Sequence, residues 1–564
     1  MRFSEIKYTR PDLSLLRNTC ISSAQIIGNT DDVKTAVDAY RTYEKELIHA
    51  HTMLEVAAVR HTIDTTDDYY SAENDFADEN NPLIAEWVNQ VEKALLSSPA
   101  RPGLEKVFGP LFFKNLEISE RAFKSELIPL MQEENKLASA YEELEASAEV
   151  EWEGKNIPLT LLGKYKQSPD REIRKRAYRL EGEYYDNHRV ELDDIFDKLV
   201  HNRDKQGKLM GYPNFLQLGY DRLGRNCYGP EEVARFRQMI LEDIVPIATK
   251  IKQKQAERIG VDQLYLYDDS IWFKDGNAAP IGDADAILAA GLDLYHNMSS
   301  ETAEFIDFMY DGELLDVLSK KGKAPGGYCT EFTEFKSPFI FANFNGTAAD
   351  VDVLTHEGGH AFAAYRAFKN GIESALSSPT IEACEVHSMS MEFLTSPYHD
   401  RFFGDKTEKY AYYHAADALT FIPYGCLVDA FQHEIYEHPD LTPEERNACW
   451  DRLERQFRPY LCRDGIPFYG RGSGWQRQLH IYLNPLYYID YCMAQTVAFD
   501  FYAASMKDYK DALSRYFTFV DFGGTKTFSD LCHSAGFKVP YEPGAIREVA
   551  KDIDAWLDSH GDRL

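Results

Sequence analysis

Residues 352–368 read DVLTHEGGHAFAAYRAF, a stretch with two histidines, a glutamate and two adjacent glycines. His356 and His360 are four residues apart, so on an α-helix their side chains lie within about 40° of each other. Two imidazoles on adjacent turns can share one tetrahedral Zn²⁺. Glu357, between them, can act as general base toward a metal-bound water. The apolar and small residues on both sides of the motif predict a helix that carries a metal site.

The same helix contains the pair Gly358-Gly359. A glycine inside a helix costs about 1 kcal/mol relative to alanine. Because glycine has no Cβ atom, the pair permits another backbone or helix to approach closely. The sequence therefore predicts close packing at this point without identifying the partner.

The composition is that of a folded chain, with 564 residues, 44% hydrophobic and 27% charged. Its length predicts more than one lobe. A net charge of −31 argues against nucleic acid and anionic membranes as partners. The first residues form no apolar leader, and the nine cysteines include no CxxC pair. We therefore expect free thiols and a cytoplasmic location.

Apolar residues at three- and four-residue spacing predict antiparallel helices from the N-terminus to about residue 165. Further helices are expected to begin at Pro230, Asp283 and Ser300. We expect an N-terminal helical domain at 1–165 and a second domain at 166–564 that contains the two histidines.

The stretch SPFIFANF, residues 337–344, predicts a strand that ends at the turn signal Asn345-Gly346. A strand just before a metal-binding helix can be an open edge that pairs with an extended peptide. It can equally belong to a small buried sheet without such a role. The residues leave both alternatives open.

A catalytic zinc site needs a third protein ligand. Residues 377–394, SSPTIEACEVHSMSMEFL, predict a helix on which Glu382, Glu385 and Glu392 lie near one face. Buried carboxylates need partners, and a metal ion or a metal-bound histidine could provide them. Spacing alone leaves Glu382 and Glu385 tied as the third ligand.

A second candidate region is residues 468–502, which begin with a glycine-rich segment and continue with His480. Tyr488 and Tyr491 follow at a spacing of three, so both can project from one helix face. Such a dense aromatic run is more typical of core packing, although these groups could also stabilise a developing oxyanion.

HEGGH, together with EVHSMSMEF beginning 29 residues after His356, resembles the M3 family of zinc oligopeptidases. The resemblance is to oligoendopeptidase F most of all, with thimet oligopeptidase as a relative. It covers most of the chain and is most specific over 338–392. It implies one Zn²⁺ per chain, held by His356, His360 and Glu385. The glutamate belongs to an E-x-x-S pattern that ends at Ser388. Glu382, Asp352 and Ser388 are then expected to support these ligands.

The same resemblance implies that His480 and Tyr488 polarise the scissile carbonyl and that Tyr491 contacts the transition state. It also implies a mobile substrate loop containing Gly470, Arg471, Gly472 and Gly474. The implied fold is mainly α, a helical two-lobed ellipsoid with a small β-sheet next to the zinc-binding helix and a deep substrate channel. Residues 166–564 would be the catalytic zinc metallopeptidase domain.

The implied function is that of a zinc-dependent endopeptidase, which hydrolyses internal bonds of short oligopeptides by Glu-assisted attack of a zinc-bound water. We expect oligopeptide substrates, no nucleic acid or membrane partner, and a monomer or weak homo-oligomer. One alternative is an exopeptidase, either a dipeptidyl carboxypeptidase or an aminopeptidase, in which Arg471 could capture a chain terminus. Another is a non-catalytic peptide-binding protein with a vestigial metal site.

Overall fold

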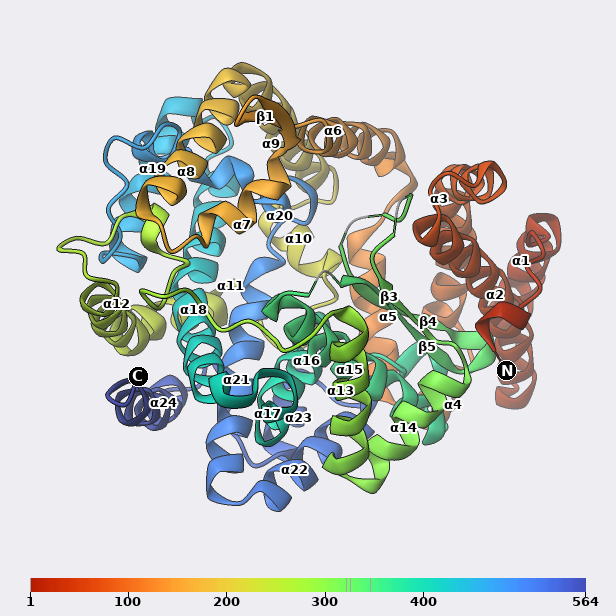
Figure 1. Ribbon diagram of the computed structural model, residues 1–564. Helices are drawn as coiled ribbons and strands as arrows, with labels where there is room; N and C mark the ends of the chain where they lie inside the picture. The colour runs from red at the N-terminus through yellow and green to blue at the C-terminus, as the bar shows by residue number, and fades with distance from the viewer. Residues whose placement is uncertain (1, 321, 325, 345) are drawn as a thin grey trace. The chain divides into compact units, whose positions relative to one another are not determined.

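The computed structural model describes residues 2–320, 322–324, 326–344 and 346–564, so the predicted turn residue Asn345 lies outside the described part (Figure 1). Helices dominate and the sheets are small, which confirms the predicted mainly α class. The chain forms two compact units that alternate along the sequence. Unit 1 comprises Met1–Ser125, Ala279–Asp405 and Ala504–Phe537, and unit 2 comprises Glu126–Ala278, Lys406–Ala503 and Lys538–Leu564. The division after residue 165, the ellipsoid and the channel stay predictions.

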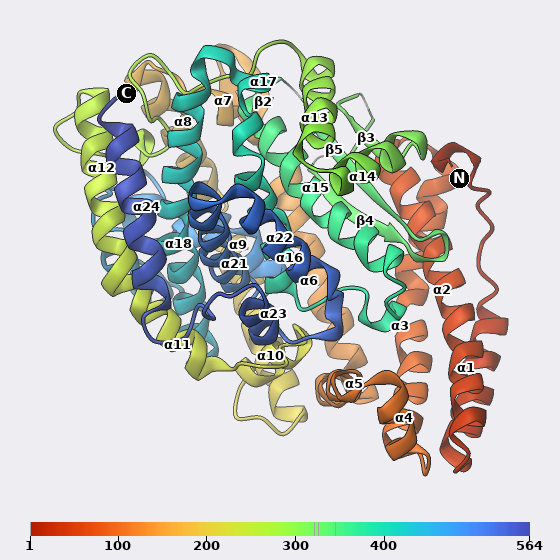
Figure 2. The same ribbon diagram turned by 90° about the horizontal axis from the view of Figure 1, so that it is seen from below.

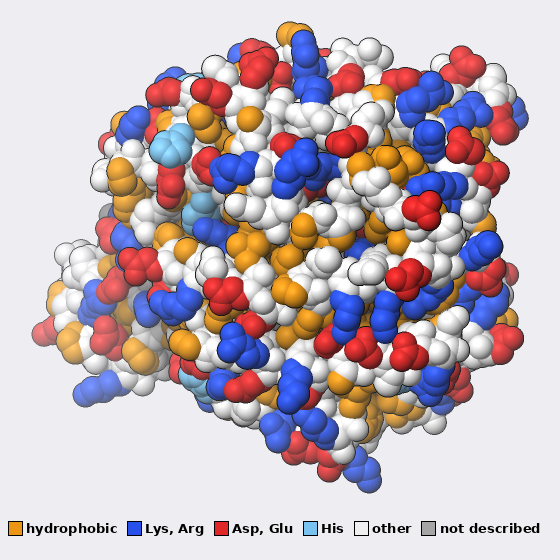
Figure 3. Space-filling model, turned by 90° about the vertical axis from the view of Figure 1, so that its left-hand side faces the viewer, with side chains coloured by type: hydrophobic (Ala, Val, Ile, Leu, Met, Phe, Trp, Pro, Cys, Tyr) orange, Lys and Arg blue, Asp and Glu red, His pale blue; other side chains and the backbone are white. Residues whose placement is uncertain are grey.

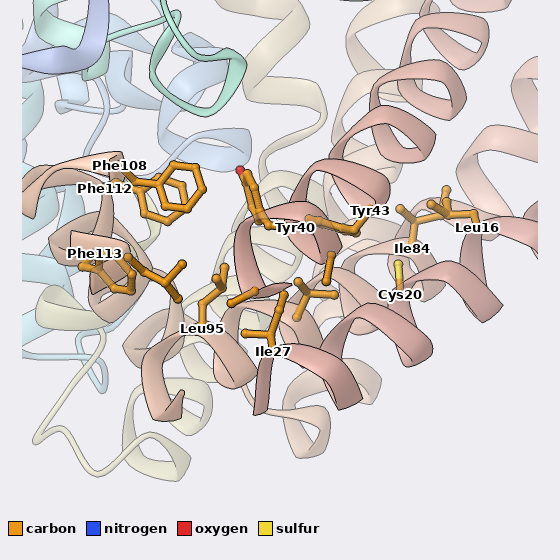
Figure 4. Packing of buried hydrophobic residues seen from close by; sticks show 14 of the residues in the cluster. Leu16, Cys20, Ile27, Tyr40, Tyr43, Ile84, Leu95, Phe108, Phe112 and Phe113 are labelled. Atoms are coloured by element: carbon orange, nitrogen blue, oxygen red, sulfur yellow. The ribbon is translucent and has the colours of Figure 1, made fainter. Parts of the chain in front are cut away.

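The N-terminal part of unit 1 is helical, as predicted, with α1 (Leu13–Asn29), α2 (Val33–Ile63), α3 (Asp68–Ser97), α4 (Arg101–Phe108) and α5 (Pro110–Ala122). The first three helices each begin after an aspartate whose carboxylate accepts first-turn N–H groups, namely Asp12, Asp32 and Asp67. Their apolar faces share one core, in which the Tyr40 and Phe112 rings meet edge to face at 5.8 Å (Figure 4).

A three-stranded sheet in unit 1 precedes the HEGGH helix. Its order is β3 (Leu315–Leu318), β5 (Ser337–Phe344) and β4 (Tyr328–Phe332), with β5 parallel to β3 and antiparallel to β4. The strand predicted at 337–344 is therefore confirmed. It is the central strand and is almost wholly buried, so the open-edge alternative does not apply to it. Helix α15 (Ala348–Lys369) follows and lies beside this sheet (Figure 2).

The paired glycines of α15 are explained by two close neighbours in unit 1. A Cβ atom on Gly359 would lie 2.5 Å from the carbonyl oxygen of His387 and 2.6 Å from Cα of Ser388, both in α16 (Ile381–Leu394). A Cβ atom on Gly358 would lie 2.0 Å from the hydroxyl of Tyr295, in α13 (Ala284–Met298). Real Cβ atoms do not approach backbone that closely, so Gly359 is required by this packing. A Cβ atom on Gly358 would need the Tyr295 ring to shift.

Other helices of unit 1 pack against α13, α15 or α16. They are α14 (Ser300–Asp311), α17 (Asp400–Phe403), α22 (Tyr509–Asp521) and α23 (Phe528–Ser534). Tyr516 of α22 donates a hydrogen bond of 2.8 Å to the same carbonyl of His387 that faces Gly359. The position of α16 is thus set from both sides.

Unit 2 is also mainly helical. Its helices are α6 (Ile128–Ala146), α7 (Leu162–Lys166), α8 (Arg171–Asn187), α9 (Arg189–Leu209), α10 (Leu216–Arg222), α11 (Pro230–Met239), α12 (Val245–Ile259), α18 (Thr407–Glu437), α19 (Pro443–Phe457), α20 (Leu479–Leu483), α21 (Tyr488–Lys507) and α24 (Ala545–Gly561). The expected helix starts at Pro230, Asp283 and Ser300 are confirmed, Asp283 as the capping residue of α13.

The expectation of helices alone up to residue 165 is wrong at one place. Strands β1 (Glu149–Trp152) and β2 (Lys155–Pro158) form an antiparallel hairpin in unit 2. Its two turn residues, Glu153 and Gly154, have φ of 53° and 80°. Two consecutive left-handed residues are what a tight hairpin turn needs, and glycine at the second position makes the turn inexpensive.

The surface carries charged side chains of both signs, as the composition of 61 basic and 92 acidic residues leads one to expect. On the face that Figure 3 shows, acidic and basic side chains are interspersed with apolar ones. Among the described residues, no helix has the length and apolar character needed to cross a membrane.

Replacing Gly359 with alanine is expected to force α16 away from α15, because the new Cβ would meet backbone atoms that have no rotamer freedom. Overpacking of this kind costs about 1–3 kcal/mol. We expect a lower melting temperature and a lower bound-zinc content in Gly359→Ala. The matched control is Gly28→Ala in α1, where nothing lies within 4 Å of the new Cβ. Equal zinc content and stability in both variants would contradict this account.

Candidate metal centre

Helix α15 presents His356 and His360 on one face, as their spacing predicts. The two ring centroids are 5.1 Å apart, and the rings are nearly perpendicular, at 80°. Both side chains are partly open, whereas Glu357 between them is buried. Burial raises the pKa of the Glu357 carboxyl, while the two nearby histidines oppose that rise.

Glu385 of α16 reaches the two imidazoles. Its Oε2 atom lies 3.4 Å from Nε2 of His356 and 3.6 Å from Nε2 of His360. These three are also the described residues whose ligand atoms all lie within 4.8 Å of one another. Burial of Glu385 opposes its ionisation, but hydrogen bonding to the two histidines outweighs this and lowers the pKa of the carboxyl well below its usual range.

The two distances from Oε2 of Glu385 to the imidazole nitrogens, 3.4 and 3.6 Å, match the spacing of ligand atoms around one tetrahedral zinc ion. Zinc binds imidazole nitrogen and carboxylate oxygen at about 2.0–2.2 Å, so neighbouring ligand atoms are about 3.3–3.5 Å apart. Two neutral nitrogens and one carboxylate oxygen are also an ordinary donor set for catalytic zinc. The residues present therefore fit the ion.

A fourth residue supports the ligands from outside. Oε1 of Glu392 lies 2.7 Å from Nδ1 of His356, the ring nitrogen that faces away from Glu385. A carboxylate at this position holds the Nδ1–H tautomer, which leaves the lone pair of Nε2 available to a metal ion. Glu392 was among the candidate carboxylates of the sequence, but the predicted supporting residues were Glu382, Asp352 and Ser388.

The structure places these three predicted supporting residues at different points. Ser388 donates a hydrogen bond to Oε2 of Glu385 at 3.1 Å and one to its own helix at 2.9 Å, from Oγ to the carbonyl of Glu385. Glu382 is fully buried at the start of α16 and accepts a hydrogen bond of 2.6 Å from Thr380. Asp352 lies one turn before His356 in α15. The supporting roles of all three stay predictions.

The other predicted catalytic residues form a separate cluster, in unit 2. His480 lies in α20, and Tyr488 and Tyr491 lie on the first turn of α21. The His480 ring is 5.0 Å from the ring of Tyr488 and 5.8 Å from that of Tyr491, both edge to face. The two tyrosine rings are 5.6 Å apart. Burial raises the pKa of Tyr488 well above its usual value, so its hydroxyl keeps its proton.

A short hydrogen-bond chain orients His480. Tyr424 donates to Oε1 of Gln478 at 2.8 Å, and Nε2 of Gln478 lies 3.0 Å from Nδ1 of His480. An amide nitrogen can only donate, so Nδ1 must accept. Neutral His480 then carries its proton on Nε2, where it serves as a hydrogen-bond donor.

Two models of known families match this chain. The Peptidase M3 N-terminal domain matches residues 3–123, and Peptidase family M3 matches residues 164–279 and 295–550. The chain belongs to peptidase family M3. This confirms the resemblance on which the site residues were assigned.

Two relatives are similar to this chain over part of their length. Oligopeptidase PepF of Bacillus subtilis (strain 168) is 23% identical over 402 residues, 70% of this chain and 58% of PepF. The oligoendopeptidase F homolog of Mycoplasma pneumoniae (strain ATCC 29342 / M129 / Subtype 1) is 23% identical over 328 residues, 55% of this chain and 51% of that protein. The matches span little more than half the length of these relatives.

A solved structure extends the similarity to the whole chain. Pz peptidase A with an inhibitor is 42% identical and superposes with a TM-score of 0.94, covering 99% of both chains. The arrangement of helices and small sheets in this M3 chain is therefore shared along its full length.

The glycine-rich segment of this M3 chain is packed by its surroundings. A Cβ on Gly472 would lie 2.4 Å from the carbonyl oxygen of Asn447, and the φ of Gly472 is +79°. Arg471, the candidate for capturing a chain terminus, directs both Nε and Nη2 to Oδ1 of Asp186, at 2.9 and 2.8 Å. Gly470 and Gly474 also approach neighbours closely, at 3.0 and 3.2 Å from their Cβ positions. A substrate-binding role of this segment stays a prediction.

Loss of the Glu392 carboxylate charge is expected to weaken zinc binding. Glu392→Gln removes the charged acceptor for Nδ1–H of His356, and such supporting groups contribute about 10–100-fold to metal affinity. Glu385→Ala should have a larger effect, because it removes a ligand atom. Competition with a chelator measures both. The matched control is Glu382→Gln, a buried carboxylate of the same helix. If this variant loses zinc as Glu385→Ala does, the assignment of the third ligand is wrong.

Proposed function

We propose that this chain is a zinc-dependent endopeptidase that hydrolyses internal bonds of short oligopeptides. The observation that carries the proposal is the convergence of His356, His360 and Glu385 on one point, with Glu357 next to the first ligand. Membership of peptidase family M3 supports a peptidase, and the relatives named as oligopeptidase and oligoendopeptidase F support peptide substrates.

Zinc would be held by the two Nε2 atoms and by Oε2 of Glu385. When bound, Zn²⁺ lowers the pKa of coordinated water and polarises a peptide carbonyl. Glu357 accepts the proton from the attacking water on its carboxylate and delivers it to the leaving amine. Its buried position keeps bulk water from competing for that proton. Glu392 keeps His356 in the tautomer that presents Nε2.

His480 and Tyr488 are proposed to stabilise the negative charge that develops on the carbonyl oxygen, with Tyr491 contacting the transition state. The chain from Tyr424 through Gln478 supports this role, because it leaves His480 with a donor on Nε2. A neutral donor whose direction is fixed beforehand needs little reorganisation as the charge develops.

The exopeptidase alternative requires a charged group that is available to capture a chain terminus. Arg471, the candidate residue, already pairs with Asp186. The ordered ligand set does not favour a vestigial site. The cytoplasmic location, the oligomeric state and the domain division after residue 165 stay predictions.

Glu357→Gln is expected to retain zinc and to lose peptide cleavage, because the amide cannot accept the proton of water. The measurement is hydrolysis of an end-blocked, internally quenched peptide, together with the zinc content of the purified protein. Wild-type cleavage of this substrate also separates an endopeptidase from an exopeptidase. Near wild-type turnover by zinc-replete Glu357→Gln would rule out the mechanism.

Gln478→Met is expected to lower kcat more than it raises KM. The substitution removes the hydrogen-bond donor to Nδ1 of His480, so the imidazole is no longer held in the tautomer with its proton on Nε2. Removing a direct oxyanion donor, as in His480→Ala, costs about 10²–10³ in kcat. The Gln478→Met loss should be smaller, and it should disappear in the His480→Ala background. The surface variant Gln456→Met is the control. An undiminished Gln478→Met effect without His480 would show that Gln478 acts in another way.

A further inference from the structure

Unit 2 contains a cavity of about 340 Å³ that the proposed hydrolysis does not use. Its charged and aromatic lining residues are Glu145, Lys166, Tyr178, Glu181, Tyr185 and Arg477. Its volume is at the lower end of the range for small-molecule sites, about 300–1,000 Å³.

The negative charge of Glu181 is already used inside this cavity. Lys166 forms an ion pair with Oε1 of Glu181, and Tyr469 donates to Oε2. Both members of the ion pair are almost fully buried. Burial, opposed by Glu181 and assisted by the nearby Arg477, lowers the pKa of Lys166 to about 8. Two cations therefore share one carboxylate.

Arg477 is the cation that is left without a hydrogen-bonded partner. Its nearest carboxylate contact is from Nε to Oε1 of Glu181, at 3.9 Å, which is too long for a hydrogen bond. Arg477 donates no hydrogen bond to any residue that the structure describes. Its side chain keeps 44% of its surface exposed and lines the cavity.

The backbone that carries Arg477 is nevertheless firmly held. The neighbouring Gln476 is fully buried, and its Nε2 donates to Asp193 at 2.6 Å. Tyr141 donates to the carbonyl of Gln476 at 2.9 Å. A fixed backbone segment thus presents the guanidinium to the cavity. Little backbone conformational entropy is therefore lost when a ligand binds.

Glu145 is the other acidic group that lines the cavity, and it only partly compensates the positive charge of Arg477. Tyr185 donates to its Oε2 at 2.8 Å, while its buried Oε1 accepts no hydrogen bond from the described residues. Burial raises the pKa of Glu145 to about 7. Its protonated form can donate a hydrogen bond to an anion.

We propose that this cavity binds the carboxylate of a short peptide, with Arg477 as its main partner. A guanidinium binds a carboxylate through two parallel hydrogen bonds. The two lining carboxylates disfavour a dianion such as phosphate, whereas a singly charged carboxylate compensates the second cation. Tyr178 and Tyr185 offer aromatic surface to the apolar part of the ligand. The choice of a peptide rests on the proposed function.

Binding of three probes by calorimetry tests this site. The probes are N-acetyl-Gly-Phe with a free carboxylate, its C-terminal amide, and N-acetyl-Gly-Glu amide, all titrated into Glu357→Gln protein so that no turnover occurs. Arg477→Gln is expected to weaken binding of a carboxylate probe about 10-fold or more, the effect of one charge-assisted hydrogen bond. Binding of the uncharged amide should be unchanged.

The pattern among the probes identifies the source of the carboxylate. If Arg477→Gln weakens binding of N-acetyl-Gly-Phe, the site recognises the peptide C-terminus. If it weakens binding of N-acetyl-Gly-Glu amide, the site recognises an acidic side chain. Inorganic phosphate is titrated in addition to these probes. The proposal fails if Arg477→Gln changes the binding of neither carboxylate probe, or if it changes the binding of phosphate alone. Because binding is measured directly, this result does not depend on whether the chain hydrolyses peptides.

Two further variants separate recognition from a loss of structure. Arg455→Gln removes an exposed arginine of α19 that pairs with Asp451, and it should leave all affinities unchanged. Arg477→Lys keeps the charge but not the bidentate geometry, so it should recover only part of the affinity. An equal loss in Arg477→Gln and Arg455→Gln would overturn the assignment, and melting temperatures verify that each variant is folded.

Discussion

The candidate site depends on how closely the backbone of α16 approaches α15 at Gly359. The absent Cβ atom brings His387 and Ser388 against the HEGGH helix. Glu385, one turn earlier on α16, can then place its carboxylate beside both imidazoles, and Glu392, further along the helix, reaches the opposite edge of His356. The low helix propensity of the glycine is offset by this contact. A larger residue would separate two helices whose side chains form one constellation.

Much of this arrangement follows from spacing within single segments. The i, i+4 relation of His356 and His360 and the strand at 337–344 are local features, and each was predictable from the residues. The hairpin at 149–158 was missed because two four-residue strands lie among long helical patterns, although Glu153-Gly154 is a turn signal. The roles of Glu392 and Gln478 depend on contacts with distant segments, which periodicity does not report.

The cluster of His480, Tyr488 and Tyr491 depends on charges that are buried in unit 2. Arg225 forms an ion pair of 2.8 Å with Asp490, and both side chains are inaccessible. Arg225 also donates to the carbonyl of Leu486 at 2.6 Å, and Leu486 adopts a left-handed φ of 66° just before α21 begins. An ion pair gains little net stability when both partners leave water. Its value here is geometric, because it sets where Tyr488 and Tyr491 start their helix.

The alternation of the two units along the chain has a consequence for the order of synthesis. Unit 1 contains the HEGGH helix, but it also needs residues 504–537, including Tyr516, whose hydroxyl holds α16 through His387. A ribosome that has completed α15 and α16 must therefore still translate residues 406–503 of unit 2 before this clamp exists. A nascent or C-terminally truncated chain displays the two histidines without the fixed glutamate. The site thus becomes complete only after α22 has been made, more than 100 residues after the last of the candidate metal ligands.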